Sequence, residues 1–153
     1  MTEAPARSVL LARVGSRLCA LQLGHVVEVM RPLPVTPLEG AAAPVRGLAL
    51  IRGQPTPVVD LGRLLFGAEP AAVARFVSVR LGGGRRAALA VDEVLGVTEL
   101  PDAPAALPPL LAGAAASAVA SVSRLDAELL LVLEAGRTVP DELWKHLAAG
   151  QAG

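Results

Sequence analysis

The feature of this sequence that most constrains its fold is an internal repeat. Residues 12–29 (ARVGSRLCALQLGHVVEV) align with residues 79–97 (VRLGGGRRAALAVDEVLGV), with one extra residue in the second turn. Both halves then continue in the same order, with a third strand-like run, a proline-rich connection and a second hairpin. A repeat of about seventy residues is too long for a solenoid unit, whereas five short strands suit a small curled barrel. The sequence therefore predicts two similar β-barrels, packed face to face around a core that neither half could bury well alone.

The two halves set the predicted boundaries. We expect one mainly β domain over residues 8–150, with subdomain one over about 8–65 and subdomain two over about 74–134. Residues 1–7 are polar or small, and are expected to be frayed. Residues 140–147 predict a short C-terminal helix, because Pro stands at its first position, acids come early, and Lys and His come late. We expect this C-terminal segment to pack on subdomain one.

The first half is organised around residues 44–65, PVRGLALIRGQPTPVVDLGRLL. Two short apolar runs in this segment flank Arg-Gly-Gln-Pro at residues 52–55, which is typical of two strands joined by a glycine-containing turn. Gly47 and Gly53 are the expected turn residues. Asp60 is expected to cap a short helix, because apolar residues follow it at helical spacing.

Composition excludes several classes of partner. Hydrophobic residues make up 53% of the chain and charged residues 18%, so a packed core is expected. The 14 basic and 14 acidic residues cancel, so no global field attracts DNA or an anionic bilayer. Phe66, Phe76 and Trp144 are the only aromatic residues, so stacking platforms for bases are missing. No apolar run reaches the ~18 residues of a membrane span. The sequence predicts a cytoplasmic protein with no nucleic-acid partner and no membrane insertion.

The residue types that usually carry chemistry are scattered. His25 and His146 are isolated, and Cys19 is expected to be a small buried residue in a reducing compartment. Residues 82–86, Gly-Gly-Gly-Arg-Arg, join two strands and lack the Lys-Ser/Thr of a phosphate-binding loop, so we interpret them as a hairpin turn. These patterns predict no catalytic residue, no metal site and no cofactor. Arg52, in a turn between apolar strands, is either an ordinary surface residue or a planar binding group.

The central hairpin resembles a known family. Gly47, Arg52-Gly53 and Pro-Val-Val-Asp-Leu at residues 57–61 are similar to the hairpin of CheW-like proteins, the adaptors of bacterial chemosensory arrays. Leu50 replaces the usual Asn of that motif and Gly62 the usual Arg. The similarity extends at lower density from about residue 9 to about residue 134. It implies two SH3-like five-stranded β-barrels packed around a shared apolar core.

The same resemblance implies partners and binding residues. Val26, Glu28 and Arg52 match positions that contact the cytoplasmic tip of a methyl-accepting chemoreceptor. We hypothesise that Glu28 and Arg52 form an ion pair at the edge of an apolar groove that grips this tip, with Val26 supplying apolar contact. The second implied partner is the regulatory domain of a CheA-like histidine kinase. The chain would then be a non-catalytic adaptor in the cytoplasm, recruited to receptor arrays.

Two alternatives stay open. The first is a divergent CheW-like protein that binds receptors but not the kinase, because residues 133–138 replace the usual acidic, helix-starting segment of the family. The second is a small-ligand-binding barrel protein or an enzyme of unknown reaction. It would need a polar pocket between the halves, for which the sequence offers Asp60, Asp92, Glu93 and Arg52.

Overall fold

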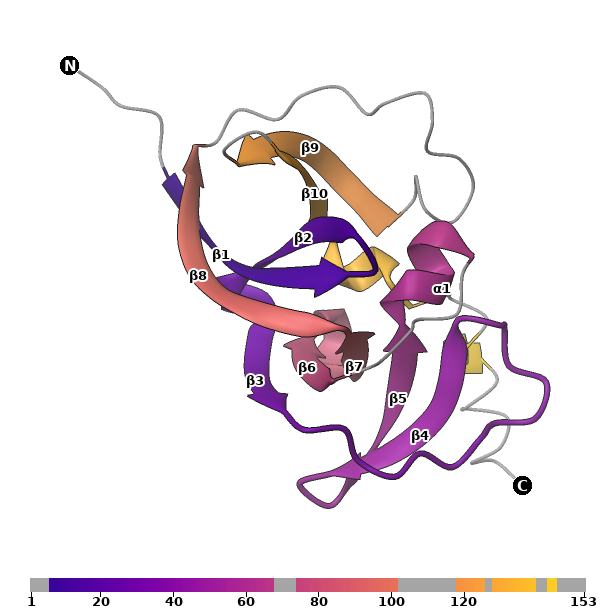
Figure 1. Ribbon diagram of the computed structural model, residues 1–153. Coiled ribbons are helices and arrows are strands. Elements are labelled where there is room, and N and C mark those ends of the chain that lie inside the picture. The colour runs from indigo at the N-terminus through magenta and orange to yellow at the C-terminus, as the bar shows by residue number, and fades with distance from the viewer. Residues whose placement is uncertain (1–5, 68–73, 102–117, 126–127, 140–142, 146–153) are drawn as a thin grey trace.

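The computed structural model describes residues 6–67, 74–101, 118–125, 128–139 and 143–145. Within them, the chain forms two five-stranded sheets that pack together, with one short α-helix at their side (Figure 1). The mainly β prediction is confirmed. In the order in which its strands pair, sheet A contains β8 (Glu93–Pro101), β1 (Ala6–Val14), β2 (Arg17–Gln22), β10 (Glu128–Leu133) and β9 (Val119–Leu125). Sheet B contains β3 (Val26–Met30), β6 (Arg75–Arg80), β7 (Arg86–Val91), β5 (Gln54–Asp60) and β4 (Val45–Ile51).

The helical elements are short. The α-helix, α1 (Leu61–Phe66), follows β5 directly. In the part of the chain that the structure describes, three single turns of 3-10 helix are η1 (Leu23–His25), η2 (Gly82–Gly84) and η3 (Ala135–Arg137). Leu143, Trp144 and Lys145 are helical, and the rest of the predicted C-terminal helix lies outside the described residues. No helix in the described part of the chain is long and apolar enough to cross a bilayer.

The division into subdomains at 8–65 and 74–134 is wrong, because the two halves of the repeat exchange strands. Sheet A takes its first hairpin, β1–β2, from the first half, and takes β8, β9 and β10 from the second. Sheet B takes its hairpin β6–β7 from the second half, and takes β3, β4 and β5 from the first. The exchange rests on four pairings between the halves: the parallel pairs β2–β10 and β5–β7, and the antiparallel pairs β1–β8 and β3–β6. Each sheet is therefore completed by the other half of the sequence (Figure 1).

The repeat itself is confirmed by details of the backbone. The β1–β8 ladder shifts its register after Leu11, and the β3–β6 ladder has its shift at the matching place, between Val26 and Glu28. The β4–β5 and β9–β10 ladders also have matching shifts. Asp60 N–H donates to the Pro44 carbonyl at 2.7 Å, and its counterpart Glu134 N–H donates to the Ala118 carbonyl at 2.9 Å. The alignment can therefore be used to compare the sheets position by position.

Apolar side chains fill the space between the sheets and also the inner, concave side of each sheet. The largest cluster lies between the sheets and draws on strands of both, for example Leu21 and Leu131 from sheet A and Val59 and Leu89 from sheet B. This is the predicted shared core. A second cluster belongs to sheet A and consists of Val9, Leu11, Leu18, Ala20, Leu100, Leu130 and Val132. A third belongs to sheet B and consists of Ala49, Ile51, Val58, Phe76, Ala88 and Ala90. We call these the central cluster, inner cluster A and inner cluster B.

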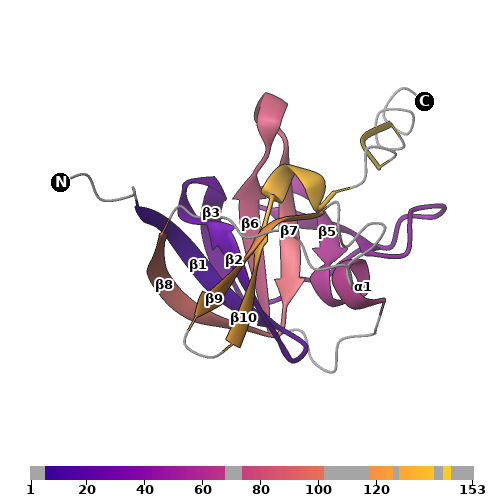
Figure 2. The ribbon, with the colours of Figure 1, turned by 90° about the horizontal axis from the view of Figure 1, so that it is seen from above.

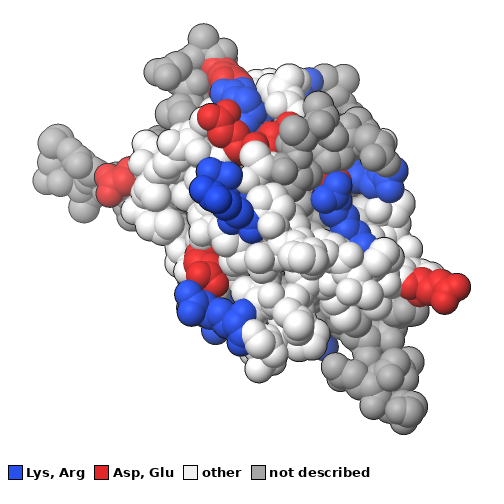
Figure 3. Space-filling view, turned by 60° about the horizontal axis from the view of Figure 1, so that its bottom comes forward, with Lys and Arg blue, Asp and Glu red and all other residues white. Residues whose placement is uncertain are grey.

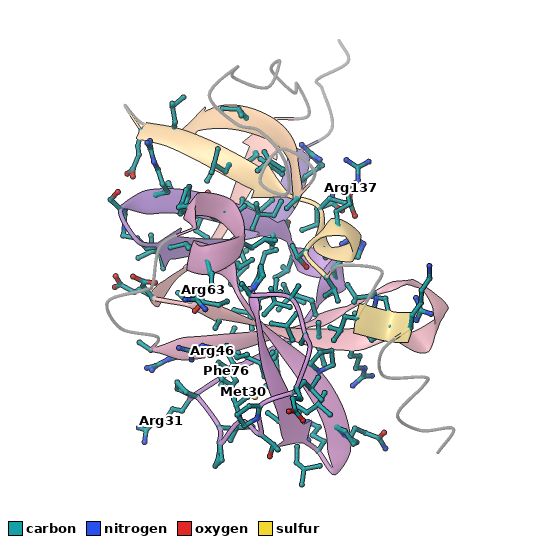
Figure 4. The ribbon with its side chains drawn as sticks, turned by 90° about the vertical axis from the view of Figure 1, so that its right-hand side faces the viewer. Met30, Arg31, Arg46, Arg63, Phe76 and Arg137 are labelled. Carbon is teal, nitrogen blue, oxygen red and sulfur yellow. The ribbon has the colours of Figure 1, made fainter. Side chains whose placement is uncertain are left out.

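Inner cluster B lies close to the surface at one end. Phe76 is fully buried in it, while Met30, its register partner on β3, packs against the cluster only in part (Figure 4).

The polar part of the surface is broken into small groups. On the face shown in Figure 3, basic and acidic side chains lie next to each other in small groups, and a broad uncharged area separates these groups. This distribution agrees with the absence of a single-sign field inferred from composition.

The start of the chain differs from the prediction. Strand β1 begins at Ala6, although residues 1–7 were expected to be frayed, because Ala6 and Arg7 pair with Pro101 and Leu100 on β8. Residues 1–5 lie outside the described residues.

Candidate functional site

The turn between β4 and β5 presents Arg52 in an unusual backbone conformation. Ile51 pairs with Gln54, so only Arg52 and Gly53 form the loop, and both have positive φ values of 51° and 77°. Two consecutive positive φ values are characteristic of a type I′ hairpin turn, which matches the twist of the flanking strands. Asn-Gly is the usual sequence there, and an Arg in the left-handed region costs about 1 kcal/mol. The fold therefore holds the backbone of Arg52 in a strained conformation at the tip of the hairpin.

Arg52 is held by a bidentate ion pair with Glu28 on β3. Arg52 Nε donates to Glu28 Oε1 at 2.9 Å, and Nη2 donates to Oε2 at 2.8 Å. The Arg52 side chain is 72% exposed and the Glu28 side chain 27%. The pair joins the two edge strands of sheet B, since Glu28 lies on β3 and Arg52 follows β4, and β6, β7 and β5 lie between these strands in the sheet. The hypothesised ion pair is present, and it lies where a partner could reach it.

Electrostatics keeps this pair charged. The hydrogen bonds from Arg52 lower the pKa of the Glu28 carboxyl, and the nearby charge of Arg86 acts in the same direction. The same hydrogen bonds raise the pKa of Arg52. Exposed pairs of this kind contribute little to stability, because water screens them. The pair therefore fixes the orientation of a planar cation more than it stabilises the fold.

An apolar groove of about 460 Å³ follows the same hairpin. Its lining reaches Leu50 and Pro55, the second register pair from the turn, and Leu50 is 68% exposed. Its lining residues are Leu33, Pro34, Thr36, Leu48, Ala49, Leu50 and Pro55. Val26, the third predicted contact residue, is half-buried and packs against the central cluster. The structure thus brings Glu28 and Arg52 together beside an apolar groove, and it places Val26 on the core side of β3.

The three predicted structural residues have clear physical roles. Gly47 was expected in a turn, but it lies within β4 at the register shift. Its φ is 143°, and a Cβ there would overlap the carbonyl oxygen of Thr36. Gly53 supplies the second positive φ of the turn. Asp60 Oδ1 accepts a hydrogen bond from Arg63 N–H at 3.1 Å at the start of α1, and Asp60 Oδ2 lies 3.4 Å from Arg46 Nε. Figure 4 shows Arg46 and Arg63 on this side of the molecule. Asp60 therefore acts as a helix cap.

The other groups considered for chemistry are in unreactive places. Cys19 is 1% exposed, and burial raises the pKa of its thiol to about 12, so the thiol stays protonated. Asp92 and Glu93 lie at the junction of two strands, because β7 ends at Val91 and β8 begins at Glu93. Among the described residues, no three His, Cys, Asp or Glu side chains gather where a metal ion could bind.

Sequence reasoning missed a second group of residues beside Arg52. Arg85 and Arg86 at the β6–β7 turn, together with Trp144, line a larger groove of about 640 Å³ that also includes Arg52. The sequence pattern 82–86 was interpreted correctly as a hairpin turn, but its two arginines were given no role. The repeat alignment contained the signal, because Arg86 stands opposite the apolar Leu18.

Comparison with known proteins agrees with this architecture. The family model for the CheW-like domain matches residues 8–142. Among solved structures, the chain is similar to the scaffolding protein TtCheW from Thermoanaerobacter tengcongensis, with a TM-score of 0.72 and 21% sequence identity over 85% of this chain and 90% of that chain. No curated protein sequence matches the chain significantly. Because the family model covers most of the sequence, from β1 to beyond β10, the chain belongs to the CheW-like domain family.

Proposed function

We propose that this protein is a non-catalytic adaptor that couples chemoreceptors to a CheA-like histidine kinase in a chemosensory array. The observation that carries the proposal, besides the family, is the exposed bidentate pair of Glu28 and Arg52 beside an apolar groove. An arginine that is already oriented loses less side-chain entropy when a partner binds. Apolar anchors with an Arg at the rim are the usual composition of a binding surface.

In this proposal, the groove next to Leu50 and Pro55 holds apolar side chains of the receptor tip, while Arg52 fixes their orientation. Val26, which packs against the central cluster and is half-buried, would contribute only the part of its side chain that stays exposed. The kinase regulatory domain would bind a different surface, so that receptor and kinase are held in a fixed relative geometry. Two weak contacts of this kind become effective when an array multiplies them.

A receptor-only adaptor is the second candidate, and one observation favours it. Asp60 caps the six-residue helix α1 after β5, but its counterpart Glu134 makes no side-chain cap, and β10 leads into the single 3-10 turn η3. The second half therefore lacks the longer helical start that the family resemblance leads us to expect. If this segment serves the kinase, its loss would leave receptor binding intact.

The ligand-binding or enzymatic alternative has little support. The space between the sheets, where it needs a polar pocket, is filled by the apolar central cluster. Its candidate groups do not converge: Arg52 pairs with Glu28, Asp60 caps α1, and Asp92 N–H bonds to the Arg13 carbonyl on sheet A.

The test is a binding assay of the purified protein with a receptor cytoplasmic hairpin and, separately, with the kinase regulatory domain. Arg52→Glu should weaken receptor binding at least about tenfold, because it places a second carboxylate beside Glu28. The same variant should leave kinase binding unchanged. Binding of both partners supports the coupling adaptor, and binding of the receptor alone supports the second candidate. Binding of neither partner would reject both.

A further inference from the structure

The larger groove lies where sheet B opens between β5 and β7. It is lined by Ile51, Arg52, Gln54, Pro55, Thr56, Pro57, Ser78, Gly84, Arg85, Arg86 and Trp144. The parallel β5–β7 ladder pairs only from Val58 with Ala88 onward. In sheet A the equivalent β10–β2 ladder starts two residues earlier, at Leu130 with Leu18. Strands β5 and β7 are therefore not paired with each other at Thr56 and Arg86, where β10 and β2 of sheet A are still joined. Thr56 still pairs with Ala49 on β4, and Arg86 with Arg80 on β6.

The residues at this opening are polar, whereas their counterparts in sheet A are apolar. By the repeat alignment, Ser78, Arg86 and Thr56 take the places of Leu11, Leu18 and Leu130. Those three leucines belong to inner cluster A, and they are at most 9% exposed. Sheet B thus has polar residues where sheet A has an apolar plug: Ser78 and Thr56 are buried, at 1% and 4% exposed, and Arg86 is exposed at the groove. Packing alone does not explain this exchange, because the leucines of sheet A fill the same place in the same backbone plan.

The groove carries an excess of positive charge. Among the residues that the structure describes, its lining includes three arginines and no carboxylate, and Glu28, which pairs with Arg52, offsets only one of them. Arg85 lies with its guanidinium carbon 4.8 Å from the centre of the Trp144 ring. A cation held over an aromatic face keeps its N–H donors free at the guanidinium edge. Figure 2 shows the β6–β7 hairpin, which carries both arginines, projecting from the rest of the molecule.

We propose that this groove binds a carboxylate-bearing segment of the receptor hairpin, with Arg85 and Arg86 as the residues that recognise its acidic side chains. The inference rests on the proposed adaptor function. It takes the receptor as occupant because Arg52 belongs both to this groove and to the proposed receptor surface, so the two are continuous. Charge complementarity sets the chemistry of the segment, since guanidinium groups form bidentate hydrogen bonds with carboxylates. Arg85 and Arg86 would then determine which receptors the adaptor accepts.

The protein contains its own probe for this proposal, since Trp144 is its only tryptophan and lies at the groove. A receptor hairpin fragment without tryptophan is titrated into the protein while the fluorescence of Trp144 is followed. The fluorescence should change on binding in the wild type. Arg85→Gln and Arg86→Gln should each weaken binding about tenfold or more, and added salt should weaken wild-type binding more than that of either variant.

Arg17→Gln is the matched control. Arg17 is the exposed counterpart of Arg85 at the β1–β2 turn of sheet A, so this variant removes the same charge from the same backbone position outside the groove. It should bind within about twofold of the wild type. If both groove variants bind like the wild type while Arg52→Glu does not bind, the groove proposal is overturned and the adaptor function stands. If the wild type itself does not bind the receptor fragment, both are overturned.

Discussion

Sheets A and B share one backbone plan but use its surface positions differently. In sheet B, Glu28 pairs with Arg52, whereas the position of Glu28 in sheet A is taken by Gly96, which has no side chain. Sheet A instead joins Arg13 on β1 to Glu128 on β10, at 2.9 Å. The counterparts of those two residues in sheet B are Arg80 and Gln54, which cannot form an ion pair.

The comparison separates what the fold needs from what has been free to diverge. The register shifts, the register of the parallel ladders, and the backbone hydrogen bonds donated by Asp60 and Glu134 are the same in both halves. The ion pairs and the inner clusters are not the same. The differences concentrate in sheet B near Arg52 and Arg86, and this is the region to which we assign binding.

The largest expected effect comes from replacing a buried leucine of sheet A with the residue found at the equivalent position of sheet B. Leu130 is fully buried in inner cluster A, and its counterpart is Thr56. Leu130→Thr should lower the free energy of unfolding by about 2–4 kcal/mol, because it removes buried methyl groups and buries a hydroxyl. Urea denaturation measures the change. Leu129→Thr, one residue away and 50% exposed in the wild type, is the control and should have little effect. Equal losses in the two variants would contradict the idea that inner cluster A is a closed apolar plug.

A smaller effect is expected from two glycines with similar backbone angles. Gly47 has φ of 143° and Gly96 has φ of 137°, but a Cβ would meet the Thr36 carbonyl only at Gly47. Gly96→Ala should therefore cost about 1 kcal/mol from backbone strain alone. Gly47→Ala should cost about 2–3 kcal/mol, because it also disrupts the Thr36–Leu48 bridge. Thermal unfolding of the two variants tests this order, and a larger loss for Gly96→Ala would reject it.

The smallest effect concerns the titration of the two ion pairs. Hydrogen bonds from Arg52 and Arg13 lower the pKa values of Glu28 and Glu128 respectively. A carboxyl whose pKa is lowered by folding stabilises the protein above its unfolded pKa, and the contribution is lost as pH falls through the folded pKa. NMR titration should show both carboxyls below their ordinary pKa. Arg52→Gln should raise the pKa of Glu28 alone, and Arg13→Gln that of Glu128 alone. A change in both carboxyls from either variant would mean that the pairs are coupled.

The strands could be predicted from the sequence, but their partners could not. Alternating apolar residues and glycine-containing turns are local signals, and they indicated the β4–β5 hairpin and the turn between β6 and β7. The choice of sheet was wrong because the two hairpins are near copies. Strand β2 can satisfy the same backbone hydrogen bonds with β10 or with a strand of its own half, and no local pattern distinguishes these pairings. Only packing of the whole chain decides between them.

The candidate binding site shows the same contrast between local sequence signals, which could be interpreted, and long-range pairing, which could not. The resemblance of the hairpin indicated Arg52 and Glu28, and the structure joins them. The groove at Arg86 was missed, because it depends on how far the β5–β7 ladder extends, and this is a property of two strands that lie far apart in the sequence. Trp144 was noted only as one of three aromatic residues, and nothing near it in the sequence indicated that Arg85 would stack on it.

The exchange of strands also affects how the chain is synthesised. Arg13 and Glu128 lie 115 residues apart in sequence but on strands of one sheet. While the second half is still being synthesised, β2 lacks its partner β10, and β1 lacks its partner β8. An unpaired edge invites pairing with other chains. The nascent protein therefore carries an open β-edge until β10 has been translated, so slow or interrupted translation prolongs the time in which it can pair with other chains.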